Sequence, residues 1–205
     1  MNVYEHHDPH STDPRSHPWN VAEHDPTHKY YNFRESPELI RSSLEDFRAW
    51  GHHAAIDGFY NLLEWLNGPD SVLESNDCAF RGPEPNTNQS FAKRLQCSGR
   101  VMILYRDLKL NTIHECVQWL TSASRHYLLQ TDPDFIFGVV GTTIMQATFI
   151  TLPPTHKQSG QELQLSFWAW GDSEIESLSN LGRIFRNMSL ALRNVSDEIQ
   201  ESTTS

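Results

Sequence analysis

The stretch QELQLSFWAWGDSEIESLSN, residues 161–180, decides the fold. In its first half, apolar side chains alternate with polar or aromatic ones, a pattern typical of a half-buried antiparallel strand over 161–172. Ser173 and Glu176 then form a capping box, which predicts the start of a helix. The inward positions of the strand are Leu163, Leu165, Phe167 and Ala169, and the outward positions are Gln164, Ser166, Trp168 and Trp170.

The predicted helix continues to about residue 200, because apolar residues repeat at steps of three and four. We expect this stripe to pack inside the chain, on the sheet. The same spacing is also compatible with a coiled-coil seam between two copies, which leaves a homodimer as an alternative. The stripe consists of Leu178, Leu181, Phe185, Met188, Leu192, Val195 and Ile199, and the first five would form the dimer contact.

Upstream, three further segments have clear patterns. A short apolar run, 100–108, predicts a buried strand, and 111–130 predicts a helix with a capping box of Thr112 and Glu115. Residues 135–154 are rich in β-branched and aromatic side chains and predict two strands, or one long strand with a bulge. The fold class is therefore α+β, with a mainly antiparallel sheet of three to five strands and helices packed on one face.

The first half of the chain predicts a long N-terminal helix over 37–66, which starts after Ser36 and ends at 67–69, Asn-Gly-Pro. Its apolar stripe contains a group of small residues, where we expect another element to cross at close range. These small residues are Gly51, Ala54, Ala55 and Gly58.

Two polar segments flank that helix. Residues 1–34 hold six histidines, several prolines and almost no aliphatic residue, a composition that predicts a flexible arm. Metal binding by these histidines is the less favoured interpretation. Residues 67–92 are acidic and bounded by prolines, and we expect an irregular loop. The predicted organisation is the arm, 1–34, followed by a single α+β domain, 35–205, with its sheet and later helices in 93–200.

Composition restricts the possible functions. The formal net charge of −10 argues against a nucleic-acid groove, which requires clustered Lys and Arg. There is no recognisable signal peptide and no apolar run of membrane-spanning length, so we expect a cytoplasmic protein without a membrane partner. The three widely spaced cysteines, Cys78, Cys97 and Cys116, predict free thiols, and we expect no cofactor.

The search for catalytic motifs gives only weak candidates. HECVQ, residues 114–118, lacks the second histidine of a zinc-protease motif. Cys78, which follows Asp77, is a weak candidate nucleophile, with His114 or His53 as its base. His53 and Asp57 are four residues apart and form a weak candidate metal pair, although a solvated helix face explains them better.

Charge segregation is more informative than any motif. No Lys or Arg lies between Arg48 and Arg81, or between Lys157 and Arg183, and both gaps contain acidic residues and tryptophans. Such a combination can steer and anchor a basic protein, although ordinary solvated acids are an equal alternative. The candidate partner-binding residues are Glu64, Trp65, Asp70, Glu74, Asp77, Trp168, Trp170 and Asp172.

Three hypotheses about function follow. The first is a non-enzymatic acidic binding module, such as an immunity protein or antitoxin that inhibits a basic, nuclease-like toxin. The second is a ligand-binding protein or enzyme with a pocket beside segment 67–92, which uses Asp77, Cys78 and a histidine. The third is a homodimeric scaffold joined through the C-terminal helix. Enzymatic activity is the less favoured of these possibilities, because no catalytic motif is complete.

Overall fold

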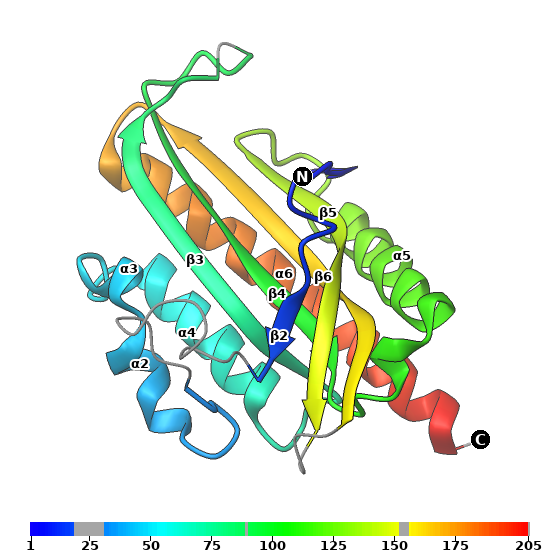
Figure 1. Cartoon of the computed structure of the whole chain (residues 1–205). Coiled ribbons are helices and arrows are strands. Elements are labelled where there is room, and N and C mark those ends of the chain that lie inside the picture. The colour runs from blue at the N-terminus through cyan, green and yellow to red at the C-terminus, as the bar shows by residue number, and fades with distance from the viewer. Residues whose placement is uncertain (19–30, 89, 152–155, 205) are drawn as a thin grey trace.

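The computed structural model describes residues 1–18, 31–88, 90–151 and 156–204. A mixed sheet of six strands is covered on one face by three long helices, α4, α5 and α6 (Figure 1). The strands are β1 (Asn2–Glu5), β2 (Arg15–His17), β3 (Leu73–Pro85), β4 (Leu95–Tyr105), β5 (Gly138–Thr151) and β6 (His156–Gly171). The helices are η1 (Pro37–Leu39), α2 (Ile40–Ser43), α3 (Glu45–Arg48), α4 (Ala54–Asn67), η2 (Leu110–Thr112), α5 (His114–Thr131) and α6 (Glu174–Thr204).

The α+β class is confirmed, but the predicted sheet had too few strands and did not include parallel pairs. The order is β1-β5-β6-β4-β3, and β2 also pairs with β5. The four long strands, β3 to β6, pair with one another in antiparallel fashion, whereas β1 and β2 run parallel to β5. Both parallel strands come from the N-terminal segment, in which no strand was predicted.

The inward positions of β6 are confirmed, but the strand is not half-buried as predicted, because Gln164, Ser166 and Trp170 on its outer face are buried as well. Its apolar positions, such as Leu165 and Phe167, are fully buried beneath the helices. The stripe of α6 packs on them, so Leu178, Leu181, Phe185, Met188 and Leu192 are all buried within the chain's own core. These five side chains therefore do not form an exposed seam for a second copy.

The long helix predicted over 37–66 is wrong. The backbone leaves the helical region at Leu44, and α4 begins only after His53, whose Nδ1 accepts a hydrogen bond from the Ala55 amide. The break allows α3 to fold back, so that the Phe47 ring stacks on Phe59 at 4.7 Å between ring centroids. Tertiary packing of Phe47 thus competes with continuous helical hydrogen bonding.

The irregular loop predicted over 67–92 is also wrong, because half of it is β3. This strand is at the edge of the sheet, where polar side chains are tolerated, and its register shifts twice. In the second shift Gly82 has a φ of +105°, and a Cβ there would lie 2.5 Å from the Gln96 carbonyl oxygen. Bulges and a polar edge remove the alternation by which a strand is recognised.

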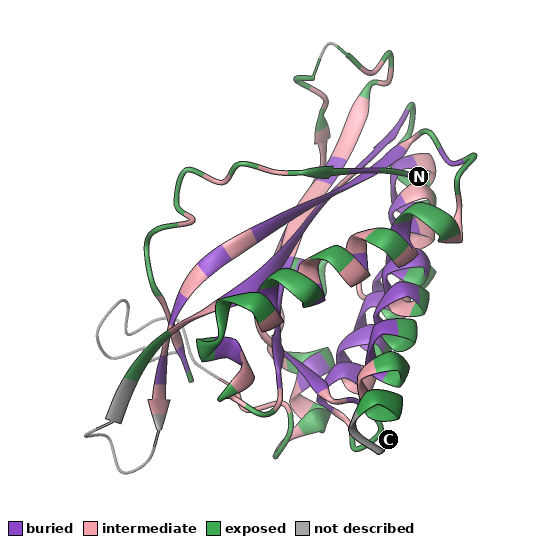
Figure 2. Ribbon diagram, turned by 90° about the vertical axis from the view of Figure 1, so that its right-hand side faces the viewer, coloured by how far each residue is buried: buried purple, intermediate pink, exposed green. Residues whose placement is uncertain are grey.

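The flexible arm predicted over 1–34 is wrong for its first part. We call residues 1–18 the N-terminal strap: β1 and β2 hydrogen-bond to β5, and the chain between them lies on the side of the sheet away from α6 (Figure 2), whereas Met1 contacts Asn187 of α6. Met1 and Val3 are buried. Of the six histidines, His24 and His28 lie outside the described residues.

The close crossing predicted at the small residues of α4 is present at one of them. A Cβ added to Gly182 of α6 would lie 3.1 Å from Ala55. Gly58, by contrast, has open space beside it. No helix in the described part of the chain has the combined length and hydropathy needed to cross a membrane.

Candidate functional site

Most of the acids predicted to face a partner are paired with cations from distant parts of the chain. Arg41 binds Glu64 at 2.7 Å, and Arg100 binds Asp77 at 3.0 Å. Glu74 is only 3% exposed, so it does not face a partner. The sequence segments that lack Lys and Arg are therefore not surfaces of unpaired negative charge in the fold.

The predicted tryptophans are also engaged within the chain. Trp168 is half-buried and stacks on Tyr4 of the strap, with 6.1 Å between ring centroids. Trp170 is 2% exposed and stacks on Phe91 at 3.7 Å. Trp65 is half-buried, with the Arg193 guanidinium 4.5 Å from its ring centroid.

The predicted partner-binding residues do not form one surface. Asp172 precedes α6, whereas the Asp70 carbonyl accepts a hydrogen bond from Gln200 near the other end of that helix. The 27 residues from 174 to 200 span about 40 Å at a rise of about 1.5 Å each. A compact binding site cannot include both Asp70 and Asp172.

The weak catalytic and metal candidates are not assembled into a site. Cys78 packs against the main core, and burial, with a smaller effect of Asp77, raises the pKa of its thiol far above the ordinary value. His114 is bound instead to Gln161, at 2.6 Å, and Asp57 to Arg41. Within the described residues, no three His, Cys, Asp or Glu side chains could hold a metal ion.

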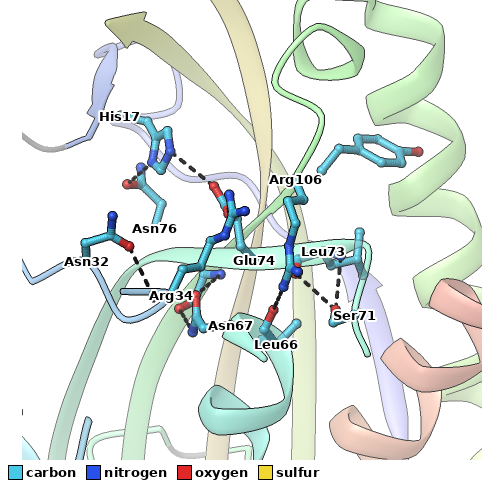
Figure 3. A network of polar contacts seen from close by, with 12 residues as sticks. His17, Asn32, Arg34, Leu66, Asn67, Ser71, Leu73, Glu74, Asn76 and Arg106 are labelled. Atoms are coloured by element: carbon cyan, nitrogen blue, oxygen red, sulfur yellow. Dashed lines mark hydrogen bonds and ion pairs between the residues drawn. The ribbon is translucent and has the colours of Figure 1, made fainter. Parts of the chain in front are cut away.

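A different group of polar side chains joins the two edges of the sheet. β2 and β3 lie at opposite edges, and four strand spacings would separate them by about 19 Å in a flat sheet. Yet His17 Nε2 lies 3.2 Å from Glu74 Oε1 (Figure 3). The sheet therefore curls at this end until its edges meet through side chains.

This junction, which we call the edge cluster, consists of His17, Arg34, Glu74, Asn76 and Glu162. Arg34 Nη1 donates to Glu74 at 3.0 Å. His17 Nδ1 lies 2.9 Å from Asn76 Oδ1, and Asn76 Nδ2 donates to Glu162 at 3.0 Å. A continuous chain of polar contacts thus runs from Glu74 of β3 to His17 of β2, returns to Asn76 of β3, and ends at Glu162 of β6.

Both ring nitrogens of His17 face acceptors, which favours the doubly protonated imidazolium. Burial lowers the pKa of His17, but its contacts with Glu74 and Asn76 and the charge of Glu162 outweigh burial and raise that pKa overall. An imidazolium has no free lone pair, so His17 in this state cannot act as a general base. The contacts of the edge cluster therefore favour the protonated form of His17.

Glu162 is the most unusual member of the edge cluster. It is fully buried, and burial, aided by the charge of Asp77, raises its pKa to about 7. Its Oε1 and the Oε1 of Gln164 have no hydrogen-bond donor among the described residues. A proton on Glu162 would turn one of these buried acceptors into a donor.

A pocket of about 170 Å³ lies beside the edge cluster. Arg34, whose side chain is 46% exposed, is its most accessible charged group, and Glu74 forms part of the wall. Asn67 is fully engaged, since it bonds to Leu63 and Ser75. The lining residues are His17, Pro18, Asn32, Phe33, Arg34, Asn67, Glu74 and Ser75.

Sequence reasoning missed the edge cluster because its members come from segments interpreted as an arm and a loop. The one available signal was in β6, where Glu162 occupies a position of the outer face. A carboxylate on the outer face of a half-buried strand is ordinary if that face is solvated. Here β3 and the N-terminal strap supply neighbouring groups, Asn76 to Glu162 and Asp8 to Gln164, and that arrangement is not encoded in the pattern of β6.

The most exposed aliphatic side chains gather at the end of the molecule where α6 begins. Ile175 is 73% exposed and Ile136 is 59% exposed. The two segments are linked by Lys93, whose Nζ lies over the Phe137 ring and binds both Asp172 and Glu176. We call this region the acidic end surface, defined by Asp134, Ile136, Asp172, Glu174 and Ile175.

Comparisons with protein-family models, with curated proteins and with solved structures found no match to this chain.

Proposed function

We propose that the protein is a non-enzymatic binding module for a basic protein, and that it acts as an immunity or antitoxin-type inhibitor of a nuclease-like toxin. The observation that carries the proposal is the acidic end surface. Ile136 and Ile175 are exposed there, and each has an exposed carboxylate within two residues in the sequence, Asp134 and Glu174, in a chain with a net charge of −10. Exposed aliphatic side chains next to negative charges suit a partner of opposite charge.

This surface differs from the one expected from sequence alone. The proposed surface keeps Asp172 and leaves out Glu74 and Asp77, because Glu74 is buried against Arg34 and Asp77 is paired with Arg15 and Arg100. Lys93 and Arg183 offset part of the negative charge by pairing with Asp172, Glu176 and Asp132. The isoleucines would supply most of the affinity, and the carboxylates would steer association.

The test uses tagged protein as bait in extracts of its native source, followed by reconstitution with each purified candidate. The wild-type chain should form a 1:1 complex with a basic protein, with association that slows as salt rises. Asp134→Lys with Glu174→Lys should slow association at least tenfold at low salt. Ile175→Ser should mainly speed dissociation.

Asp70→Lys with Asp107→Lys is the matched control, because it changes the net charge equally at the other end of the molecule. If the control slows association as much as the test pair, the acidic end surface is not the contact. If every reconstituted partner is acidic or neutral, the proposed class of partner is excluded.

A second candidate function is binding of a small anionic ligand in the pocket beside Glu74. It is supported by the pocket's position next to segment 67–92 and by the exposed guanidinium of Arg34. Asp77 and Cys78 do not line the pocket. Titration with phosphate and acetate, followed by amide shifts of Ser75 and Asn32, tests it. Saturable shifts that are lost in Arg34→Gln would favour the candidate, and non-saturable shifts would exclude it.

A further inference from the structure

The junction between β2 and β3 consists mainly of contacts between charged groups. β2 pairs with β5 over three residues, Arg15 to His17. Toward β3, His17 lies 3.2 Å from Glu74 and Arg15 lies 3.9 Å from Asp77, and Asn76 bonds to His17 and to the Ser16 carbonyl. The stability of the closed junction is therefore sensitive to the charge state of the buried groups beside it.

Glu162 is placed where its protonation decides that charge state. Its Oε2 accepts a hydrogen bond from Asn76, which itself contacts His17 and the Ser16 carbonyl. The charged groups that face it are Arg15 and His17 from β2 and Asp77 from β3, while its register partner on β5 is Met145. Asp8 of the strap binds the neighbouring Gln164.

We propose that the strap is a proton-operated clamp: protonated Glu162 keeps β2 docked against β3, and loss of that proton on the alkaline side of neutrality loosens the junction. An ionised Glu162 would be a buried carboxylate near the charge of Asp77, with one oxygen lacking a donor. Release of the strap returns the carboxylate to water, so opening and deprotonation favour each other.

The direction of the effect follows from linkage. The pKa of Glu162 in the closed junction, about 7, lies above its ordinary value of 4.5. Closure therefore binds a proton, and the closed state weakens as pH rises from about 4.5 to 7 and beyond. The pKa of His17 is also raised, so its contribution to closure is likewise lost as pH rises.

Hydrogen exchange of the whole chain tests the clamp. The amide of Gln146 on β5 donates to the Ser11 carbonyl of the strap, and that of Thr148, two residues further along and opposite Ser16 of β2, points to the same edge. Exchange of these two amides would be followed from pH 6.0 to 8.5 and corrected for intrinsic rates. If opening restores the ordinary pKa of Glu162, the opening equilibrium should increase about tenfold over that range. Amides in the core of α6 should show no such change.

Glu162→Gln, which keeps the neutral form at every pH, should reduce the increase to the part contributed by His17. Glu115→Gln, an exposed charge removal on α5, should behave as wild type. An unchanged opening equilibrium in the wild-type chain, or equal pH dependence in Glu162→Gln, would overturn the proposal. If Glu162→Gln does not fold, carboxyl NMR of the wild type decides, since titration of Glu162 near 4.5 also overturns it.

Discussion

Glu74 illustrates how a single carboxylate acquires its role from residues far away in the chain. Its side chain is 4% exposed and lies between His17, 57 positions before it, and Arg34, 40 positions before it. Removing a buried charge from two cations costs far more than removing one exposed ion pair. Glu74 therefore contributes to stability, and its substitution would not report on partner binding.

We expect Glu74→Lys to lower the free energy of unfolding by about 3–5 kcal/mol, because it would bury a third cation beside His17 and Arg34. Glu74→Gln should cost about 1–3 kcal/mol, since it leaves those two partners without their counter-charge. Urea denaturation of the purified variants measures both. Asp70→Lys, at an exposed position, should stay within about 0.5 kcal/mol of wild type. Equal stability of Glu74→Lys and Asp70→Lys would contradict this role.

At this scale, the sequence predicted burial better than it predicted polar contacts. The apolar positions of β6 and α6 are in the core because their periodicity follows from backbone geometry alone. The arginine partners of Glu64, Glu74 and Asp77 depend on the three-dimensional arrangement of segments that are 23 or more residues apart. No local pattern contains that information.

Among the elements, the crossing of α4 and α6 shows the value of small residues. Gly182 of α6 passes so close to Ala55 of α4 that a single added carbon would be in tight contact. Gly58 lies one turn along α4, and nothing lies within 4 Å of a Cβ added there. A larger side chain would therefore clash at Gly182, whereas it would have room at Gly58.

We expect Gly182→Leu to destabilise the protein by about 1–3 kcal/mol, because the larger side chain must push α4 away. Gly58→Ala should instead stabilise it by up to about 1 kcal/mol, since alanine favours the helix and has room. Thermal unfolding of the two variants beside wild type distinguishes them. A stabilising Gly182→Leu would mean that the helices do not cross at this point.

The two predicted capping boxes differ in the fold. Ser173 Oγ accepts from the Glu176 amide at 3.2 Å, whereas the Thr112 hydroxyl lies in η2 and donates to the Lys109 carbonyl. We expect Ser173→Ala to cost about 1 kcal/mol and Thr112→Ala less than about 0.5 kcal/mol. Chemical denaturation measures the difference. Similar losses in both variants would show that the hydroxyl of Ser173 does not stabilise the start of α6.

Elements with strong periodicity were predictable, and those shaped by tertiary contacts were not. α5, β5, β6 and α6 were expected within a few residues of their bounds. The helix expected over 37–66 failed because the apolar stripe continues through a chain reversal that brings Phe47 onto Phe59. β3 failed because an edge strand with two register shifts lacks alternation.

For the whole molecule, two sets of titrating groups act in opposite directions. Hydrogen bonds from cations lower the pKa values of surface carboxylates such as Asp57, Asp132 and Asp172. Their contribution to stability is present above about pH 4 and is lost as the pH falls through their folded pKa values. His17 and Glu162, whose pKa values are raised, stabilise the fold at low pH and lose that contribution as pH rises through 7.

We therefore expect maximal stability between about pH 5 and 6.5. Circular dichroism melting curves between pH 3 and 9 would measure it, with Glu162→Gln as the control that flattens the decline above pH 6.5. A melting temperature that climbs continuously from pH 6 to 9 would contradict the prediction, because the raised pKa values of His17 and Glu162 require the opposite slope.

The parallel pairing of β1 with β5 has a consequence for protein synthesis. Asn2 lies opposite Val139, so its strand partner is made 137 residues later. At about 5–20 residues per second, the ribosome takes roughly 7–27 s to produce that partner. An aliphatic strand left waiting for so long would be prone to aggregate. We expect the polar composition of the strap, rich in histidine, aspartate and proline, to limit such aggregation until β5 is made.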